Sequence, residues 1–268
     1  MSDAQRIIKC FAIALAILLV FNILGSILYA FTSIGNIFEE DNSLENLKVL
    51  EVNGDFEILD IDVSSVNVII KNNDYFKVET NNKNINTKQE DNKLFITEKN
   101  HNWFKNNNTD LIIYLPEDYI LEKVNIESGA GKVNIDNLDA KKMYLDLGAG
   151  KVDIKEILVL EEIEIDGGAG EINLTNSNIN NLDLDMGIGN LNLSAKITGN
   201  SEIDTGVGQV DIDLIGDLDD YKIKIDKGIG NATIDGNSVN ANTYYGNGNN
   251  LIDIDGGIGS IKIEFIGN

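Results

Sequence analysis

From Lys48 onward, apolar and polar residues alternate along the chain. The segments VLEV, FEILDIDV, VNVIIK, FKVET, KLFITE and DLIIYL each place apolar residues at every second position, with Asn, Asp and Gly clusters between them. A period of two is typical of β-strands that bury one face. Pro116 closes one of these segments, where its missing N–H does least harm. The pattern predicts an all-β protein after residue 47, with no helix in that region.

A Gly-x-Gly motif recurs seven times between residues 129 and 259, with successive offsets of 19, 20, 19, 19, 22 and 29 residues. A near-constant period of this length predicts a solenoid in which each repeat forms one rung. The predicted structural glycines are Gly129, Gly131, Gly148, Gly150, Gly168, Gly170, Gly187, Gly189, Gly206, Gly208, Gly228, Gly230, Gly257 and Gly259.

The positions around each motif show how a rung is built. The residue three before the first glycine and the residue six after it are aliphatic in all seven copies, and the residue four after it is always apolar. Simple alternation would place the positions three before and four after on opposite faces, so the motif must turn the chain inward again. We therefore expect a parallel β-helix or solenoid of about 19–20-residue rungs, each a strand, a glycine corner, a second strand and a polar return. Stacked about 4.8 Å apart, seven rungs would make a rod of roughly 34 Å. The segment Tyr244–Asn250 could form a degenerate extra corner.

The N-terminal segment Cys10–Phe31 carries no charged residue. About 22 residues at about 1.5 Å each span about 33 Å, enough for the hydrocarbon core of a bilayer. We therefore predict one transmembrane α-helix. A cleaved signal peptide is the alternative, although the apolar run exceeds the usual length and no A-x-A-like site follows it. The expected organisation is a cytoplasmic N-terminus (1–9), the transmembrane helix (10–31), a stalk (32–47), an N-terminal β region (48–123) and the regular Gly-x-Gly solenoid (124–268).

Charges on the two sides of this segment predict its orientation. Arg6 and Lys9 precede it, and Glu39, Glu40 and Asp41 follow it. The positive-inside rule then makes the chain a single-pass protein of the cell membrane, with a cytoplasmic N-terminus and an extracytoplasmic C-terminal domain. Cys10 precedes the apolar run, so it is not placed as a lipoprotein cysteine.

The composition excludes several classes of partner and site. Beyond the anchor the chain has 19 Lys (21 basic residues minus Arg6 and Lys9) against 43 acids (44 minus Asp3), a net charge of -24. This charge excludes nucleic acid as a partner. One cysteine and one histidine exclude an intramolecular disulfide and the usual zinc clusters. With 43 acids in the exported region, no pair of carboxylates stands out as catalytic, and we predict that the protein is not an enzyme.

One position of the repeat is acidic in every copy, which packing of the core does not explain. The residue two before each first glycine is acidic in all seven copies: Glu127, Asp146, Asp166, Asp185, Asp204, Asp226 and Asp255. If the rungs stack in register, these carboxylates form a ladder. Each could accept hydrogen bonds from the glycine N–H groups of its own corner, the ladder could bind a cation such as Ca²⁺, or it could contact a cationic polymer. No cofactor is predicted, calcium stays open, and the identity of any metal is unknown.

A second candidate site combines the only histidine and the only tryptophan of the chain. His101, Trp103 and Phe104 lie between the segments KLFITE and DLIIYL, which we expect to form a hairpin. Aromatic residues at a loop tip often bind sugars or lipid head groups, so this is a candidate recognition loop. Packing of the aromatic rings on the hairpin itself is the alternative.

An apolar helix, an alternating region such as FEILDIDVSSVNVIIKNNDYFKVET, and then LIIYLPEDYILEKVNIESGAGKVNI with serial Gly-x-Gly rungs resemble the bacterial putative-adhesin domain family of unknown function. The resemblance covers about residues 50–263. It implies a right-handed β-helix-like fold at the cell surface, relatives found beside envelope-stress signalling systems, and no catalytic residues to carry over.

The sequence therefore predicts a non-enzymatic membrane-anchored β-solenoid that acts as an adhesin-like interaction module or as an envelope-stress sensor. Its partners would be the membrane, through the N-terminal helix, and a cell-envelope polymer or a membrane protein. Two alternatives stay open. One is a calcium-dependent carbohydrate-active enzyme on a β-helix, although the charge of the domain would repel a polyanionic substrate. The other is a passive surface structural protein.

Overall fold

The computed structural model describes residues 46–99 and 109–267. Residues Ser43–Asn268 form one compact unit. Within the described part, the strands join in a single 16-stranded sheet and the only helix is a 3₁₀ turn, η1 (Leu218–Asp220). No helix of these residues is long and apolar enough to cross a membrane, and the predicted transmembrane segment 10–31 lies outside them. The all-β prediction is confirmed for residues 48–99 and 109–267.

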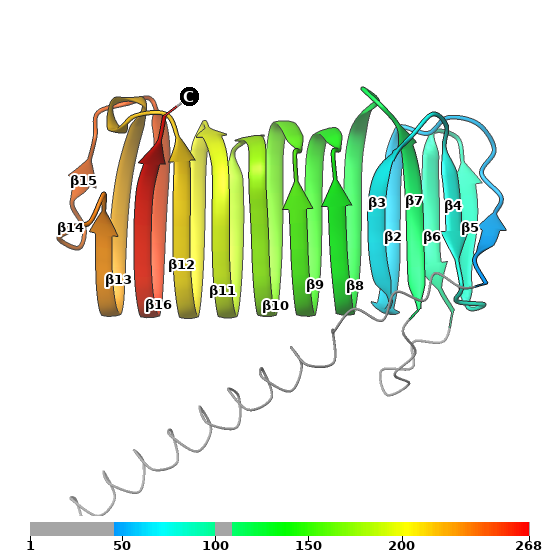
Figure 1. Ribbon diagram of the computed structural model, residues 1–268, viewed down its shortest axis with the longest axis horizontal. Coiled ribbons are helices and arrows are strands. Elements are labelled where there is room, and N and C mark those ends of the chain that lie inside the picture. The colour runs from blue at the N-terminus through cyan, green and yellow to red at the C-terminus, as the bar shows by residue number, and fades with distance from the viewer. Residues whose placement is uncertain (1–45, 100–108, 268) are drawn as a thin grey trace, which may run out of the picture. The chain divides into compact units, whose positions relative to one another are not determined.

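Five successive rungs form the regular centre of the sheet. They are β8 (Ile120–Asp136), β9 (Asp139–Lys155), β10 (Leu158–Asn180), β11 (Leu182–Thr198) and β12 (Asn200–Ile215). Each pairs in parallel with the next, and each Gly-x-Gly lies beside the Gly-x-Gly of its neighbour (Figure 1). The predicted β-solenoid is therefore confirmed.

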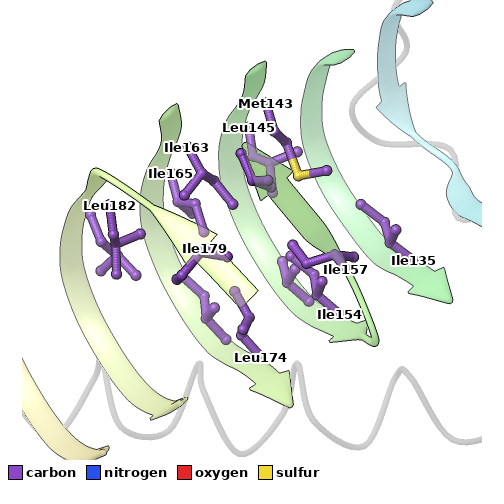
Figure 2. Packing of buried hydrophobic residues seen from close by; sticks show 14 of the residues in the cluster. Ile135, Met143, Leu145, Ile154, Ile157, Ile163, Ile165, Leu174, Ile179 and Leu182 are labelled. Atoms are coloured by element: carbon purple, nitrogen blue, oxygen red, sulfur yellow. The ribbon is translucent and has the colours of Figure 1, made fainter. Parts of the chain in front are cut away.

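Side chains on both sides of each glycine corner point into the core. Ile203, three residues before a corner, and Val210, four residues after it, are both buried, and so are their counterparts in all seven copies. Figure 2 shows the resulting stacks in β8–β11, where Leu145 and Ile165 come from the first strand segment of their rungs and Ile154 and Leu174 from the second. The corner thus reverses the alternation of the pleat, as the sequence pattern requires.

The glycines are needed because neighbouring rungs approach each other closely at the corner. The second glycine of every motif has a φ between 149° and 156°, a region essentially restricted to glycine. A Cβ atom on Gly208 would lie 1.6 Å from the carbonyl oxygen of Gly189 in the preceding rung. Gly206, the first glycine of the same motif, would place a Cβ 2.4 Å from the oxygen of Gly187. Both columns therefore exclude side chains.

The last two rungs do not follow sequence order. β16 (Asn250–Ile266) lies between β12 and β13 (Tyr221–Ile234) and pairs in parallel with both, so β13 ends the stack (Figure 1). The residues between β13 and β16 form two short strands, β14 (Asn237–Ser238) and β15 (Tyr244–Tyr245), which pair antiparallel with β13. The segment Tyr244–Asn250 is therefore not an extra glycine corner. It returns the chain across the outer side of β13, and that return accounts for the longest offset between repeats.

Two further rungs without glycine corners extend the stack at its other end. β2 (Ile58–Ser65) and β3 (Asn67–Asn73) pair with the two halves of β8, and β6 (Lys93–Glu98) and β7 (Asp110–Pro116) pair in parallel with β2 and β3. The antiparallel strands β5 (Ile85–Glu90), β4 (Lys77–Thr80) and β1 (Lys48–Leu50) complete this end. The expected hairpin between KLFITE and DLIIYL is wrong, because β6 and β7 pair with different strands and not with each other.

Candidate functional site

The seven acidic residues of the repeat stack in register. Each pairs in the sheet with the acidic residue of the adjacent rung, and an eighth, Asp62 on β2, pairs with Glu127. Because β16 precedes β13 in the stack, Asp255 lies between Asp204 and Asp226. We call this row the acidic ladder. In spatial order it contains Asp62, Glu127, Asp146, Asp166, Asp185, Asp204, Asp255 and Asp226.

Sequence reasoning missed Asp62 because its rung has no glycine motif. The segment LDIDVSSV matches VNIESGAG in position, with Ser64 and Val66 in place of the two glycines. The alternating pattern before the corner was the signal that could have found it.

A groove runs along the ladder beside the glycine corners. It has a volume of about 920 Å³, and six ladder carboxylates from Asp146 to Asp226 line it together with the first glycine of the same six corners. Leu147, Met186 and Thr205, each directly before a corner glycine, add to its lining. The groove crosses six neighbouring rungs, so its length suits an extended ligand lying across them.

The ladder carboxylates are not satisfied by the protein around them. In the described residues, no side-chain hydrogen bond and no ion pair involves any of the seven repeat carboxylates. The Oδ1 atom of Asp204 is fully buried and has no hydrogen-bond partner. The first of the three alternatives, capping of each glycine corner by its own carboxylate, is therefore not formed in these residues.

Two ladder residues near the middle respond to this environment. Burial, followed by the negative charges of Asp185, Asp146 and Asp183, raises the pKa of Asp166. Burial and a similar set of neighbours, led by Glu202 and Asp185, raise the pKa of Asp204. In both cases desolvation and like charges disfavour the ionised form.

A second acidic column runs parallel to the ladder, and sequence reasoning missed it. The residues four before the first glycine point outward in the same strands, and Glu164, Asp183, Glu202 and Asp253 lie in register on β10, β11, β12 and β16. Lys224 ends this column with a hydrogen bond of 3.0 Å from its Nζ to Oδ1 of Asp253. The signal was present in the sequence as four acids at one repeat position. We call the ladder and this second column together the acidic face.

In the strand segments after the corner, polar side chains of neighbouring rungs pair with one another. Asn192 Nδ2 donates to Oδ1 of Asn173 at 2.7 Å, and Asn173 Nδ2 donates to Oδ1 of Asp153 at 2.8 Å. Lys151 lies 3.5 Å from the carboxylate of Asp153 and 3.4 Å from that of Glu171. These stacked polar residues of β9, β10 and β11 are therefore paired, whereas the carboxylates of the acidic face stack mostly without partners.

The other predicted sites are a metal site and the aromatic recognition loop. Within the residues that the structure describes, no three Asp, Glu, His or Cys side chains converge as a metal site would require. The ladder carboxylates follow a line instead of surrounding a point. His101, Trp103 and Phe104 lie outside the described residues. The acidic face is thus the candidate site that the fold assembles.

A model of the family described as Toastrack DUF4097 matches residues 35–253, which is most of the chain. The chain belongs to this family. The match covers the N-terminal rungs and the first six glycine corners in chain order, and it confirms the resemblance to a family of unknown function. No curated protein matches the chain.

Several solved structures are similar to this Toastrack chain. The crystal structure of a putative adhesin from Bacteroides fragilis covers 82% of this chain and 96% of its own, with 16% identity and a TM-score of 0.51. A putative cell adhesion protein from Clostridium sporogenes covers 82% of this chain and 98% of its own, with 20% identity and a TM-score of 0.38. A putative adhesin from Parabacteroides merdae covers 84% and 97%, with 14% identity and a TM-score of 0.35. At 16% identity the B. fragilis structure shows a shared fold and nothing about function. We draw no conclusion from the other two structures, whose TM-scores are below 0.5.

Proposed function

We propose that this Toastrack protein is a non-enzymatic, adhesin-like interaction module, and that its acidic face binds an extended cationic chain of the cell envelope. The observation that carries the proposal is the ladder of unpaired carboxylates. Stacked rungs hold these like charges about 5 Å apart, at a cost somewhat under 1 kcal/mol per neighbouring pair in a watery environment. Positive charges arriving from a partner would offset this repulsion.

The regular spacing of carboxylates on the acidic face matches a ligand that carries positive charges at regular intervals. The ladder presents one carboxylate per rung and the second column presents another, so a chain with regularly spaced ammonium groups can form several contacts at once. Individual exposed ion pairs contribute little, but their number and the effective concentration of a linked second group raise the affinity. The description of the B. fragilis protein as a putative adhesin agrees with a binding role.

A linear polylysine tests this role. We expect the fragment Ser43–Asn268 to bind it, with affinity falling as salt rises. The variant Asp185→Asn/Asp204→Asn should weaken binding several-fold. The matched control is Asp136→Asn/Asp213→Asn, which removes the same charge from the strand segments after the corner. An equal loss in both variants would mean attraction to the net charge alone and would contradict the proposal.

Anchoring in the membrane is a separate part of the proposal and rests on the apolar segment 10–31 and the charges around it. Protease added to intact spheroplasts should then degrade the chain after Phe31 while the N-terminus stays protected. Protection of the bulk of the chain would reverse the proposed orientation. A role in envelope-stress sensing rests only on the family resemblance.

The non-enzymatic character is tested with the same soluble fragment. Incubation with panels of cell-wall material and polysaccharides should release no sugar. Sugar release that depends on acidic-face residues would favour the carbohydrate-active alternative.

A further inference from the structure

A second groove runs along the acidic face, on the side of the second column that is away from the ladder. It has a volume of about 500 Å³ and crosses five neighbouring rungs, β9, β10, β11, β12 and β16. None of its lining residues lines the groove beside the glycine corners. Sites for small ligands usually have volumes of about 300–1,000 Å³, so the second groove is large enough for a ligand of its own.

Unpaired carboxylates occupy the middle of the second groove. Glu164, Asp183 and Glu202 line it and lie in register on β10, β11 and β12. Among the described residues, none of the three forms an ion pair or a side-chain hydrogen bond. Ionised carboxylates can only accept hydrogen bonds, so this wall of the groove requires donors or positive charges from a ligand.

The carboxylates at the two ends of the groove are already paired. Near β9, Glu162 accepts hydrogen bonds from the hydroxyl of Tyr144 and from Lys142 Nζ, the latter at 3.0 Å. On β16, a carboxylate oxygen of Asp253 lies 2.9 Å from Lys224 Nζ. The part of the groove with free acceptors therefore spans three rungs, which lie about 4.8 Å apart.

A buried hydroxyl group in the second groove also lacks an acceptor. Ser201 lines the groove and is only 4% exposed. The residue five before the first glycine is apolar in every other copy of the repeat, so packing of the core does not explain this hydroxyl. Its Oγ accepts the amide of Leu182 at 3.0 Å, but the hydroxyl donates to no group of the described residues. Beside it, the exposed side-chain amide of Asn200 forms no hydrogen bond in the same part of the chain.

This combination of groups fits sugar rings better than a peptide. A pyranose ring has apolar C–H faces that can contact Ile163 and Leu182 on the floor of the groove, and hydroxyl groups that donate to carboxylates. An extended peptide would bring carbonyl oxygens, which need donors that the row of carboxylates does not provide. Its side chains on one face also repeat about every 6.6–6.8 Å, out of step with rungs about 4.8 Å apart.

We propose that the second groove binds a short segment of an amino-sugar polymer, whose hydroxyl and protonated amino groups contact Glu164, Asp183 and Glu202. This inference rests on the proposed binding of a cationic envelope chain by the acidic face, and it specifies the chemistry of that chain. The amines neutralise the carboxylates, and the ring hydroxyls fill the acceptor positions that remain. Ser201 and Asn200 supply donors to the oxygen atoms of the sugar.

Three probes of similar size test this assignment by calorimetric titration of the full chain in detergent, at slightly acidic pH and low salt. They are a β-1,4-linked glucosamine trimer with free amines, the same trimer with every amine acetylated, and trilysine. The glucosamine trimer should bind several-fold more tightly than trilysine, which has the same net charge. It should also bind more tightly than the acetylated trimer, which keeps the rings and loses the charge. Equal affinity for the glucosamine trimer and either of the other probes would overturn the proposal.

A neutral substitution separates recognition of the sugar from attraction by charge. Asn200→Ala should weaken binding of the glucosamine trimer several-fold and leave binding of polylysine unchanged. The matched control is Asn190→Ala, because Asn190 is also exposed and lines neither groove. Trimer binding that is the same in Asn200→Ala as in the wild type would overturn the proposal.

A charge-removing variant distinguishes this inference from the proposed function on which it rests. Asp183→Asn/Glu202→Gln should weaken binding of the glucosamine trimer more than Asp136→Asn/Asp213→Asn, and an equal loss in both would overturn the inference. If polylysine binds through the acidic face and the trimer does not bind, this inference alone is wrong. If polylysine binding does not depend on the acidic face, the proposed function is wrong as well.

Discussion

Asp185 and Asp204 lie side by side across the β11–β12 pair, and in the described structure neither carboxylate accepts a hydrogen bond. Seven residues farther along the same strand, Asn192 donates its side-chain amide to Asn173 on β10 at 2.7 Å. The same stacking geometry therefore brings carboxylates together before the corner and pairs amides after it. This difference between the two strand segments underlies the first prediction.

Asp204→Asn should stabilise the fragment Ser43–Asn268 at neutral pH, by roughly 0.5–1 kcal/mol, because it removes repulsion with the neighbouring rungs. The pKa of Asp204 is raised in the folded state, so the folded protein binds its proton more readily than the unfolded chain. The unfavourable contribution of Asp204 to the stability of the wild type should then diminish as pH falls from neutral through that raised pKa, and the advantage of the variant should shrink. Urea unfolding at several pH values measures both effects, with Asp213→Asn as the control.

Glu98 should show the opposite dependence on pH. Burial alone would raise the pKa of this carboxyl, but hydrogen bonds from the Ser64 hydroxyl and amide and from Asn82 lower it overall. A lowered folded pKa contributes stability above the unfolded pKa, and this stability is lost as pH falls through the folded value. Glu98→Gln should therefore cost about 1–3 kcal/mol at neutral pH and much less in acid. A cost that did not change with pH would contradict this account.

Gly208→Ala should destabilise the fold by more than about 2–3 kcal/mol. Its φ of 156° is unfavourable for alanine, and the new Cβ would meet the backbone oxygen of Gly189. Gly54→Ala is the control, since Gly54 has a φ of 79° but no atom within 4 Å of a Cβ built there. Its cost should be limited to backbone strain of about 1 kcal/mol. Equal costs in chemical denaturation would show that close stacking is not what excludes side chains.

Ile203→Asp should cost several kcal/mol, because an unpaired charge would enter the core at a position that is 0% exposed. Ile120→Asp makes the same replacement at a position that is 46% exposed and should be nearly neutral. Thermal unfolding followed by circular dichroism compares the two. A well-folded Ile203→Asp protein would mean that the register of the rungs is different.

Calcium should stabilise the fragment no more than sodium chloride of the same ionic strength. The carboxylates of the ladder form a line, and no three acidic side chains of the described residues converge on one point. Divalent ions should then act by screening and not as a bound ligand. An additional rise in melting temperature with Ca²⁺, lost in Asp185→Asn/Asp204→Asn, would establish a cation site on the ladder.

The repeat in the sequence determined the rung. The residues that face the core are set by the period of two and by the glycine corner, and both are local properties of the chain that can be read from spacing. Ile203 and Ile212 were assigned inward from their columns, and both are buried. The in-register ladder followed from the same spacing, because rungs of nearly equal length stack equivalent residues.

Only the tertiary structure decided which strands are neighbours. β16 enters between β12 and β13, and β6 and β7 pair with β2 and β3 instead of with each other. Strand pairing joins residues far apart in the chain, and no local pattern distinguishes one parallel neighbour from another with the same alternation. The terminal position of the corner at Ile229 follows from that order, since a strictly sequential stack would have ended on β16 and Ile258. The sequence thus specifies what each rung looks like, and the folded structure decides which rung ends the stack.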